Sequence, residues 1–285
     1  MKNKINLLSL VGTILAISLV SCGGDNSKNI TICASELPHA KILNEVIKDL
    51  VKEDGYNLSV TVLDWTIQND AVANNEYDAN YFEHIPYLNT YKGTSKLIAA
   101  CKVHYEKLCL YSSDKDTNKV LDDGESIELV NDPSNIERAL NLLASYNILT
   151  INPSNYNSNK EFTNFDTTNP TSCVTFLNGY KNCTLTCVKE SNLCASLPDY
   201  NFGIIPGNTA LTGLGESLSS RIVLSEKASD ELISEKANII TVKEENKNSE
   251  KTKELVKVFA DSRVKKYIES TFGDSVLYHY ENLIA

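Results

Sequence analysis

The order of apolar segments between residues 30 and 63 constrains the fold more than any other feature of the sequence. Residues 30–33 are apolar and short enough for a strand. The apolar side chains of residues 39–53 recur at helical spacing, and Gly55 follows as a typical helix terminator. Residues 58–63 then alternate as a second strand. A strand–helix–strand order predicts parallel strands joined by a right-handed crossover, the basic unit of an α/β fold.

The rest of the chain continues this alternation, which places the whole protein in the α/β class. Two strands, at 96–103 and 107–111, flank a point where we expect the chain to cross into a second region. The other expected elements, in order, are a short helix at 68–76, strands at 77–82 and 127–130, a helix at 135–146, a loop at 152–172, strands at 185–188, 202–205 and 238–242, and a long amphipathic helix at 250–272.

Length and charge exclude some functions. The chain has 285 residues, enough for one large or two modest domains. It carries 27 Lys and Arg against 37 Asp and Glu, a net charge of -10, which argues against a nucleic-acid partner. The sequence contains no H-E-x-x-H, no G-x-S-x-G and no P-loop. We therefore expect a binding protein rather than an enzyme, without a cofactor.

The N-terminus has the pattern of a bacterial processing segment. Lysines precede an apolar stretch at 7–20 that is too short for a typical membrane-spanning helix. The stretch ends in Leu-Val-Ser-Cys, which matches a lipobox ending at Cys22. The sequence thus predicts a signal peptide over 1–21, and a lipidated Cys22 with a small polar tether over 22–29. Such an anchor holds an extracytoplasmic domain at a membrane surface without spanning it. An ordinary signal peptide followed by a chance cysteine is the alternative.

The other cysteines leave three interpretations open. Without Cys22 an odd number remains of the 8 in the chain, so they cannot all pair with one another. Four lie between residues 173 and 194, where one or two disulfides would suit an exported protein. Zinc is an alternative, although the Cys183-x3-Cys187 spacing is not the usual one. Free buried thiols are the third. The cysteines concerned are Cys33, Cys101, Cys109, Cys173, Cys183, Cys187 and Cys194.

A run of aromatic residues carries the clearest functional signal. Residues 78–88 read D-A-N-Y-F-E-H-I-P-Y-L and bring together the rings of Tyr81, Phe82, His84 and Tyr87. Apolar faces with a few polar groups suit a pocket for a small amphipathic molecule. Packing of the same rings into a core at the end of a strand is the alternative.

A second run resolves this choice. Residues 131–140 read N-D-P-S-N-I-E-R-A-L, a turn and a cap followed by an apolar helix that carries Arg138. Together the two runs resemble the methionine-binding lipoprotein family, the NlpA/MetQ group, whose members are extracytoplasmic receptors of an ABC importer. The usual family pattern is close to D-A-N-x-F-Q-H-x-P-Y-L followed by N-D-P-[ST]-N-x-x-R-A-L. The resemblance extends from about residue 30 to about residue 285.

The resemblance implies a two-lobe periplasmic-binding-protein fold, type II-like, with a ligand cleft between the lobes. Lobe one would comprise residues 30–107 and 209–285, and lobe two residues 108–208. The chain would cross between the lobes near 105–110 and again near 206–210. Closure of the cleft around the ligand would follow from such a hinge.

The resemblance also implies roles for individual residues. Arg138 would bind the carboxylate of a free amino acid through its guanidinium, and His84 would contact the charged end of the ligand. Tyr81, Phe82 and Tyr87 would hold the ligand side chain, since a thioether packs well against aromatic rings. From the residues alone, Arg138 could equally lie on a solvated helix face and His84 could be structural.

Further candidates come from other segments of the family pattern. Trp65, the only Trp, stands where the family usually has a Tyr, and would close one wall of the pocket or lie in the core. Asn131 and Asn135 belong to the second run, although Asn135 could instead cap the helix, and Asn238 matches a later ligand-contacting Asn. The family usually has I-N-x-x-Y-A at the second crossing, whereas this chain has Pro206, which lacks a donor. Asn208, two residues on, could replace the missing contact.

The sequence thus predicts a lipid-anchored receptor in the cell envelope. Its ligand would be L- or D-methionine or a close derivative, such as an oxidised methionine or a short peptide. Its partners would be an ABC importer permease and, through Cys22, a membrane. The alternative is a surface lipoprotein that has kept the fold, lost transport, and acts as an adhesin or antigen.

Overall fold

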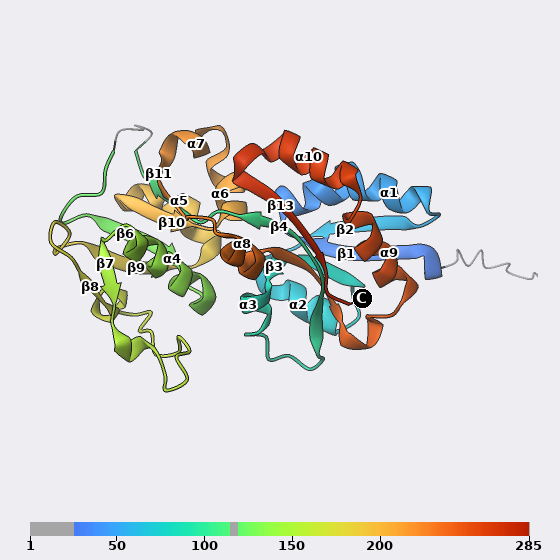
Figure 1. Ribbon diagram of the computed structural model, residues 1–285, viewed down its shortest axis with the longest axis horizontal. Helices are drawn as coiled ribbons and strands as arrows, with labels where there is room; N and C mark the ends of the chain where they lie inside the picture. The colour runs from blue at the N-terminus through green and yellow to red at the C-terminus, as the bar shows by residue number, and fades with distance from the viewer. Residues whose placement is uncertain (1–25, 115–118, 285) are drawn as a thin grey trace, which may run out of the picture.

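The computed structural model describes residues 26–114 and 119–284, which form two β-sheets with helices packed around each (Figure 1). The predicted signal peptide and Cys22 lie outside these residues. Two lobes are evident, one built on each sheet, as the two-lobe α/β prediction requires. None of the described helices is both long and apolar enough to span a bilayer.

The first sheet has six strands in the order β13-β4-β12-β3-β1-β2. Strand β1 pairs in parallel with β2 and β3, which confirms the parallel pair predicted from residues 30–63. The other pairings, β12 with β3 and β4, and β13 with β4, are antiparallel. The strands are β1 (Asn29–Ala34), β2 (Asn57–Val62), β3 (Ala79–His84), β4 (Leu97–Glu106), β12 (Asn238–Lys243) and β13 (Val276–Asn282).

Helices cover both faces of the first sheet, so its central strands are buried throughout. Every residue of β3 and of β12 is buried, as expected for strands with both faces covered. Ile32, Ile240 and Phe259 belong to the core that the strands form with the helices. The surrounding elements are η2 (Glu36–Ala40), η3 (Leu43–Ile47), α1 (Lys48–Glu53), α2 (Trp65–Ala73), α3 (Ile85–Leu88), α9 (Glu250–Phe259) and α10 (Ser262–Phe272).

The second sheet has five strands in the order β11-β5-β10-β6-β9. Its core includes Leu129, Leu140 and Phe202. The strands are β5 (Cys109–Ser112), β6 (Ser126–Val130), β9 (Thr184–Val188), β10 (Phe202–Ile205) and β11 (Ile222–Ser225), with a separate ribbon of β7 (Leu149–Ile151) and β8 (Val174–Phe176). The helices of this lobe are α4 (Pro133–Ser145), α5 (Leu193–Ser196), α6 (Gly207–Leu214) and α7 (Leu218–Arg221), whereas α8 (Asp230–Lys236) packs against β4 and α3 of the first lobe.

Helix α4 begins at Pro133 because Asp132 caps it. The Asp132 carboxylate accepts hydrogen bonds from the backbone N–H of Ser134 (3.1 Å) and of Asn135 (3.2 Å), and from the side chains of both residues (2.7 Å each). These bonds satisfy donors that a helix otherwise leaves unpaired in its first turn. The cap also fixes the direction in which the following residues point.

The second crossing between the sheets lies later than the sequence predicts. The expected crossing near 206–210 is the start of α6, which packs against α5. Strand β11 still belongs to the second sheet, because Ser225 pairs with Cys109 of β5. The chain returns to the first sheet only after Ser225, through α8 to β12. The expected assignment of 209–285 to lobe one therefore does not hold for β11, and α6 contacts η2 of the first lobe as well as α5.

The long helix expected at 250–272 is two helices. Helix α9 ends at Phe259, and Asp261 caps α10 by accepting a hydrogen bond from the Arg263 N–H (2.8 Å). The hydrophobic pattern continues across this break, so apolar periodicity alone does not reveal it. Strand β13 was also missed, because it lies at the sheet edge and most of its residues are only partly buried.

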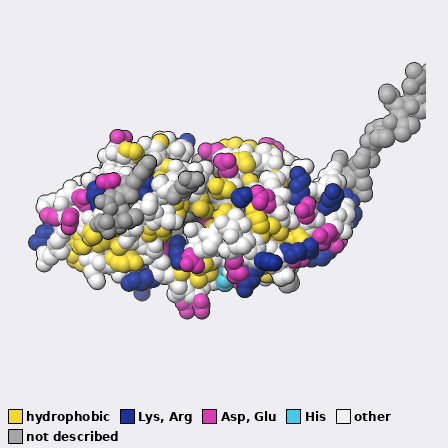
Figure 2. All heavy atoms as spheres, turned by 90° about the horizontal axis from the view of Figure 1, so that it is seen from above, with side chains coloured by type: hydrophobic (Ala, Val, Ile, Leu, Met, Phe, Trp, Pro, Cys, Tyr) yellow, Lys and Arg dark blue, Asp and Glu magenta, His cyan; other side chains and the backbone are white. Residues whose placement is uncertain are grey.

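All seven cysteines among the described residues are free thiols. The group at 173–194 forms neither a disulfide nor a cluster of metal ligands within residues 26–114 and 119–284. Of the three interpretations left open by the sequence, the structure selects free thiols. On the face drawn in Figure 2, Lys and Arg side chains lie interspersed with Asp and Glu, so the net negative charge is not gathered into one patch there.

We expect Asp132→Ala to lower the free energy of unfolding by about 1–2 kcal/mol, as loss of a helix cap does. Urea unfolding monitored by circular dichroism would measure it. Ser249→Ala is the matched control, because Ser249 caps α9 through a backbone bond from Thr252 (3.1 Å). Since Asp132 accepts more bonds, a smaller effect at Asp132 than at Ser249 would contradict this account of α4.

Candidate ligand-binding site

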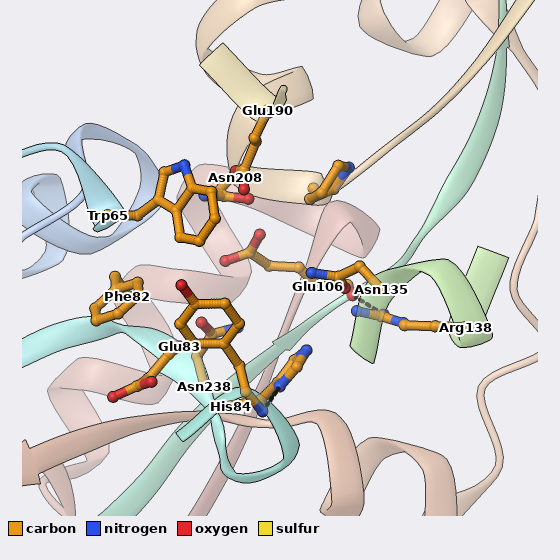
Figure 3. Close-up of a pocket in the computed structure, with 13 residues that line it drawn as sticks. Trp65, Phe82, Glu83, His84, Glu106, Asn135, Arg138, Glu190, Asn208 and Asn238 are labelled. Atoms are coloured by element: carbon orange, nitrogen blue, oxygen red, sulfur yellow. Dashed lines mark hydrogen bonds between the residues drawn. The ribbon is translucent and has the colours of Figure 1, made fainter. Parts of the chain in front are cut away.

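A cavity open to solvent lies between the two sheets (Figure 3). Its walls come from both sheets and from the segments that connect them. The lining residues are Trp65, Phe82, Glu83, His84, Tyr87, Glu106, Asn135, Arg138, Glu190, Pro206, Gly207, Asn208 and Asn238.

Three aromatic rings form one wall of the cavity. Trp65 begins α2, Phe82 lies on β3 and Tyr87 lies on α3. The rings of Trp65 and Tyr87 are 5.3 Å apart, those of Phe82 and Tyr87 are 5.8 Å apart, and both pairs meet edge to face. The Trp65 indole nitrogen is buried without a hydrogen-bond partner among the described residues. This wall offers a ligand apolar faces and one unsatisfied N–H donor.

Arg138 points toward the cavity but is already paired. Its Nε donates to Glu226 Oε1 (2.7 Å), and its Nη2 donates to Glu226 Oε2 (2.6 Å) and to the Glu106 carbonyl (2.6 Å). Tyr105 donates to Glu226 as well (2.6 Å). Burial raises the pKa of the Glu226 carboxyl, but the hydrogen bonds and charge of Arg138 outweigh burial and hold it below its usual value. The guanidinium is therefore fixed in position at the cavity wall.

His84 is a neutral hydrogen-bond donor. Its Nδ1 accepts the Tyr87 backbone N–H (3.1 Å), so the proton of the neutral ring is carried by Nε2. Burial, helped by the charge of Arg138, lowers the pKa of His84 to about 3. Asn135 lies beside it, one helical turn before Arg138, with its amide held by Asp132. The side chains of His84 and Asn135 are hydrogen-bonded to each other and lie beside the Arg138 guanidinium at one end of the cavity.

Beneath the cavity floor lies a buried polar network around Glu106. Its Oε1 accepts from His104 Nε2 (2.7 Å) and lies 3.6 Å from His39 Nε2, which in turn is 3.1 Å from Asn238 Oδ1. Burial lowers the pKa of His39 to about 4 and that of His104 to about 3, so both rings are neutral near pH 7. Burial also raises the pKa of Glu106.

The residues His39, His104 and Glu106 are the one group with metal-ligand spacing within the described chain. Their candidate ligand atoms are engaged with one another, with Asn238, or, on the other side of His104, with Tyr81. The group therefore holds the Glu106 carboxylate in place as part of the cavity wall.

Glu190 and the segment 206–208 complete the site. Glu190 follows β9, is almost fully buried, and accepts hydrogen bonds from Thr209 and Asn208. Burial raises its pKa to about 7. Position 207 requires glycine because its backbone lies close to the Glu106 side chain. A Cβ at this position would lie 2.7 Å from Glu106 Cβ and 2.9 Å from Glu106 Oε2. The Pro-Gly-Asn sequence thus brings the start of α6 against Glu106.

The structure brings together most of the residues predicted for the site. Tyr81 is an exception: it is fully buried, packs against His39 and Phe259, and does not line the cavity. Asn131 is the other, because it is exposed before the cap of α4. The predicted residues that line the cavity are Trp65, Phe82, His84, Tyr87, Arg138, Asn208 and Asn238.

Sequence reasoning missed the carboxylates of the cavity. Asn135, which the sequence offered either as a ligand contact or as a helix cap, lines the cavity three residues before Arg138, on the same helix face. Glu106 falls in the predicted first crossing, next to the cleft. Glu190 had no local signal, since only the fold carries it from the end of β9 to the aromatic wall.

Comparison with known proteins identifies the family of this chain. The model of the NlpA lipoprotein family matches residues 30–279. The chain belongs to the NlpA lipoprotein family. Among curated relatives, it is 30% identical over 277 residues to the methionine-binding lipoprotein MetQ of Bacillus subtilis, covering 93% of this chain and 94% of that protein. The family consists of substrate-binding lipoproteins and is not an enzyme class.

Solved structures of NlpA-like proteins share the fold. A putative lipoprotein from Ruminococcus gnavus superposes with a TM-score of 0.75 at 32% identity, covering 88% of this chain and 99% of that one. A nutrient-binding protein from Burkholderia cenocepacia, solved bound to methionine, superposes with a TM-score of 0.73 at 24% identity, covering 87% and 99%. The two-sheet, periplasmic-binding-protein-like architecture is therefore that of the family.

Glu83 stands where the family pattern has Gln. Its oxygens accept from Asn69 Nδ2 (3.0 Å) and Thr241 Oγ1 (2.9 Å), and the residue is 3% exposed. Burial raises the pKa of this carboxyl to about 8, against an ordinary value of 4.5. Ionising Glu83 at neutral pH therefore costs free energy in the folded state.

Replacing Glu83 by Gln should stabilise the protein more at pH 8 than at pH 5. The folded state keeps a proton that the unfolded state releases between the ordinary pKa of 4.5 and about 8, so wild-type stability falls as pH rises through this window. The variant lacks this fall, and the stability difference should grow by on the order of a few kcal/mol. Urea unfolding at both pH values measures it, with the exposed Glu235→Gln as control. An equal difference at both pH values would contradict it.

Proposed function

We propose that this chain captures methionine, or a close derivative of it, outside the cytoplasm and delivers it to an ABC importer. The names of its relatives supply the ligand class, since MetQ of Bacillus subtilis is a methionine-binding lipoprotein. The predicted anchor at Cys22 would keep the domain at a membrane surface, facing a permease. On this proposal the protein binds its ligand without changing it chemically.

The observation that carries the proposal is the separation of polar groups in the cavity. At one end Arg138 presents a guanidinium suited to a ligand carboxylate, with the polar side chains of His84 and Asn135 beside it. Glu106 and Asn238 present acceptors suited to an α-ammonium. A free amino acid has these two groups on one carbon, so it can satisfy both sides at once.

The aromatic wall would take the side chain. Trp65, Phe82 and Tyr87 offer ring faces and edges, against which a thioether makes favourable contacts. These rings come from the first sheet, whereas Arg138, Asn135 and Glu190 come from the lobe of the second. A ligand held by both groups favours the closed arrangement over an open one, and we propose that the closed form is what the permease binds.

Calorimetric titration of residues 23–285 tests the function directly. The protein would first be unfolded and refolded to remove carried-over ligand. L-methionine, D-methionine, methionine sulfoxide, cysteine and a Gly-Met dipeptide would be titrated in turn. We expect sub-micromolar binding of at least one methionine form. If the protein is folded and none of these ligands gives heat, the alternative of a surface lipoprotein that has lost transport is favoured. Pro206 would then be the relevant difference, because it stands in the cleft where the family usually has Asn.

Substitutions of the buried ion pair should move methionine affinity in opposite directions. Arg138→Ala should weaken binding at least tenfold, because the carboxylate loses its guanidinium. Glu226→Gln should bind methionine at least as tightly as wild type, because it leaves the guanidinium with no competing carboxylate.

Folding of both variants must be checked, since breaking a buried pair costs about 3–5 kcal/mol. Arg221→Ala is the matched control, because Arg221 donates to the carbonyls of Ser112 and Ser113 and does not line the cavity. Unchanged affinity in folded Arg138→Ala would remove Arg138 from the site.

A further inference from the structure

The charged groups that line the cavity do not balance for a neutral zwitterion. Glu83, Glu106 and Glu190 contribute carboxyl groups, and Arg138 contributes the only guanidinium or ammonium of the lining. Glu226 already neutralises that guanidinium through two hydrogen bonds. One carboxylate, Glu106, is accounted for by the α-ammonium of an amino acid. Glu83 keeps its proton at neutral pH and is satisfied by Asn69 and Thr241, which leaves Glu190 as the lining carboxyl without a positive partner.

Glu190 is the carboxyl that the proposed function does not use. It is 8% exposed and reaches the cavity from the opposite side to His84. Figure 3 shows its carboxyl group beside Asn208 and facing the space between the Trp65 indole and Glu106. It is also close enough to influence the Tyr87 hydroxyl electrostatically. Glu190 therefore borders the part of the cavity assigned to the ligand side chain.

No basic residue lines this end of the cavity or the hollow outside it, among the residues that the structure describes. Trp65, Glu190 and Asn208 are shared with a second hollow of about 1000 Å³, whose lining also includes Glu36 and Asp64 and no Lys or Arg. Glu190 accepts hydrogen bonds from neutral donors only, Thr209 and Asn208. A buried carboxylate without a counter-charge is costly, and a cationic ligand group would remove that cost.

Aromatic rings beside a carboxylate are the arrangement that recognises weakly hydrated cations. A positive group within about 6 Å of a ring face is attracted by the π-system, and Trp is the strongest such partner. Here the edge-to-face rings of Trp65 and Tyr87 adjoin Glu190. A sulfonium or an alkylated ammonium fits this surface better than a plain ammonium, which gives up more hydration and asks for more hydrogen-bond acceptors.

We propose that Glu190 and the Trp65 indole form a cation subsite, and that the amino acid bound carries an onium group, a sulfonium or alkylated ammonium, on its side chain. This inference rests on the proposed function, because it assumes that an amino acid occupies the cavity. It assigns the ligand one more charge than methionine has. The α-carboxylate and α-ammonium keep their places at Arg138 and Glu106.

Four amino acids of similar length separate the possibilities by calorimetry on refolded protein. S-methylmethionine carries a sulfonium, methionine and norleucine are uncharged on the side chain, and lysine carries a plain ammonium. We expect S-methylmethionine to bind at least tenfold more tightly than methionine or norleucine, and more tightly than lysine. Trp65 is the only Trp, so its fluorescence should respond more to the sulfonium than to norleucine.

Glu190→Gln supplies the structural test. In this variant the preference for S-methylmethionine over methionine should fall to less than threefold. Glu36→Gln removes the same charge from an exposed residue outside the cavity and should keep the wild-type preference. Circular dichroism confirms folding, and Glu190→Asp, which retains the charge, should keep part of the preference.

The outcomes distinguish this inference from the proposed function. Methionine binding with no preference for the sulfonium, or a preference that Glu190→Gln leaves intact, overturns the cation subsite while methionine capture stands. Tightest binding of lysine overturns the onium assignment. Absence of binding by all four amino acids overturns the onium assignment, and only if the full methionine series above also gives no heat does it overturn the proposed function. If the Gln variant does not fold, the wild-type affinities and the Trp65 fluorescence still decide.

Discussion

The buried contact between Arg138 and Glu226 is the interaction on which the arrangement of the two sheets depends. Arg138 comes from α4, Glu226 follows β11, and the carbonyl that Arg138 also binds ends β4. One guanidinium therefore joins three segments distant in sequence. Its donors are largely satisfied by the protein, so a ligand carboxylate must compete with Glu226 for the same cation. The ligand affinity then depends on how much more strongly Arg138 binds the ligand carboxylate than it binds Glu226.

Local sequence predicted the parts of the site that lie in continuous runs. Phe82, His84 and Tyr87 fall within eleven consecutive residues, at 78–88, and Arg138 falls in a capped helix, so motif and helix signals suffice. Tyr81 was misplaced because strand alternation tells which residues share a face but not which face meets the cavity. Glu190 is brought in by the packing of the second lobe, which no short window of sequence encodes, whereas Glu106 ends β4 at the predicted first crossing.

The same distinction explains the errors in the fold. Strands β1 and β12 stand out as largely apolar runs, and β3 is marked by its aromatic residues. The break between α9 and α10 depends on one capping carboxylate, Asp261, within an unbroken hydrophobic pattern. Strand β11 is short and partly exposed, and its pairing with β5 is a long-range contact. Hydrophobic periodicity does not predict an element boundary that is set by a single polar group or by pairing with a distant strand.

The two connections between the lobes lie side by side, with a consequence for how the molecule can move. The Glu226 N–H donates to the Leu108 carbonyl (3.0 Å), and the Leu108 N–H donates to the Glu226 carboxylate (3.1 Å). Two short strands bonded in this way resist stretching and sliding, whereas twisting them costs little. The relative motion that costs the lobes least is therefore a rotation about these two connecting segments. The cavity lies beside that axis, so a rotation that parts the lobes separates the aromatic wall from Arg138 and Asn135, and it displaces the outer surfaces of the lobes further still.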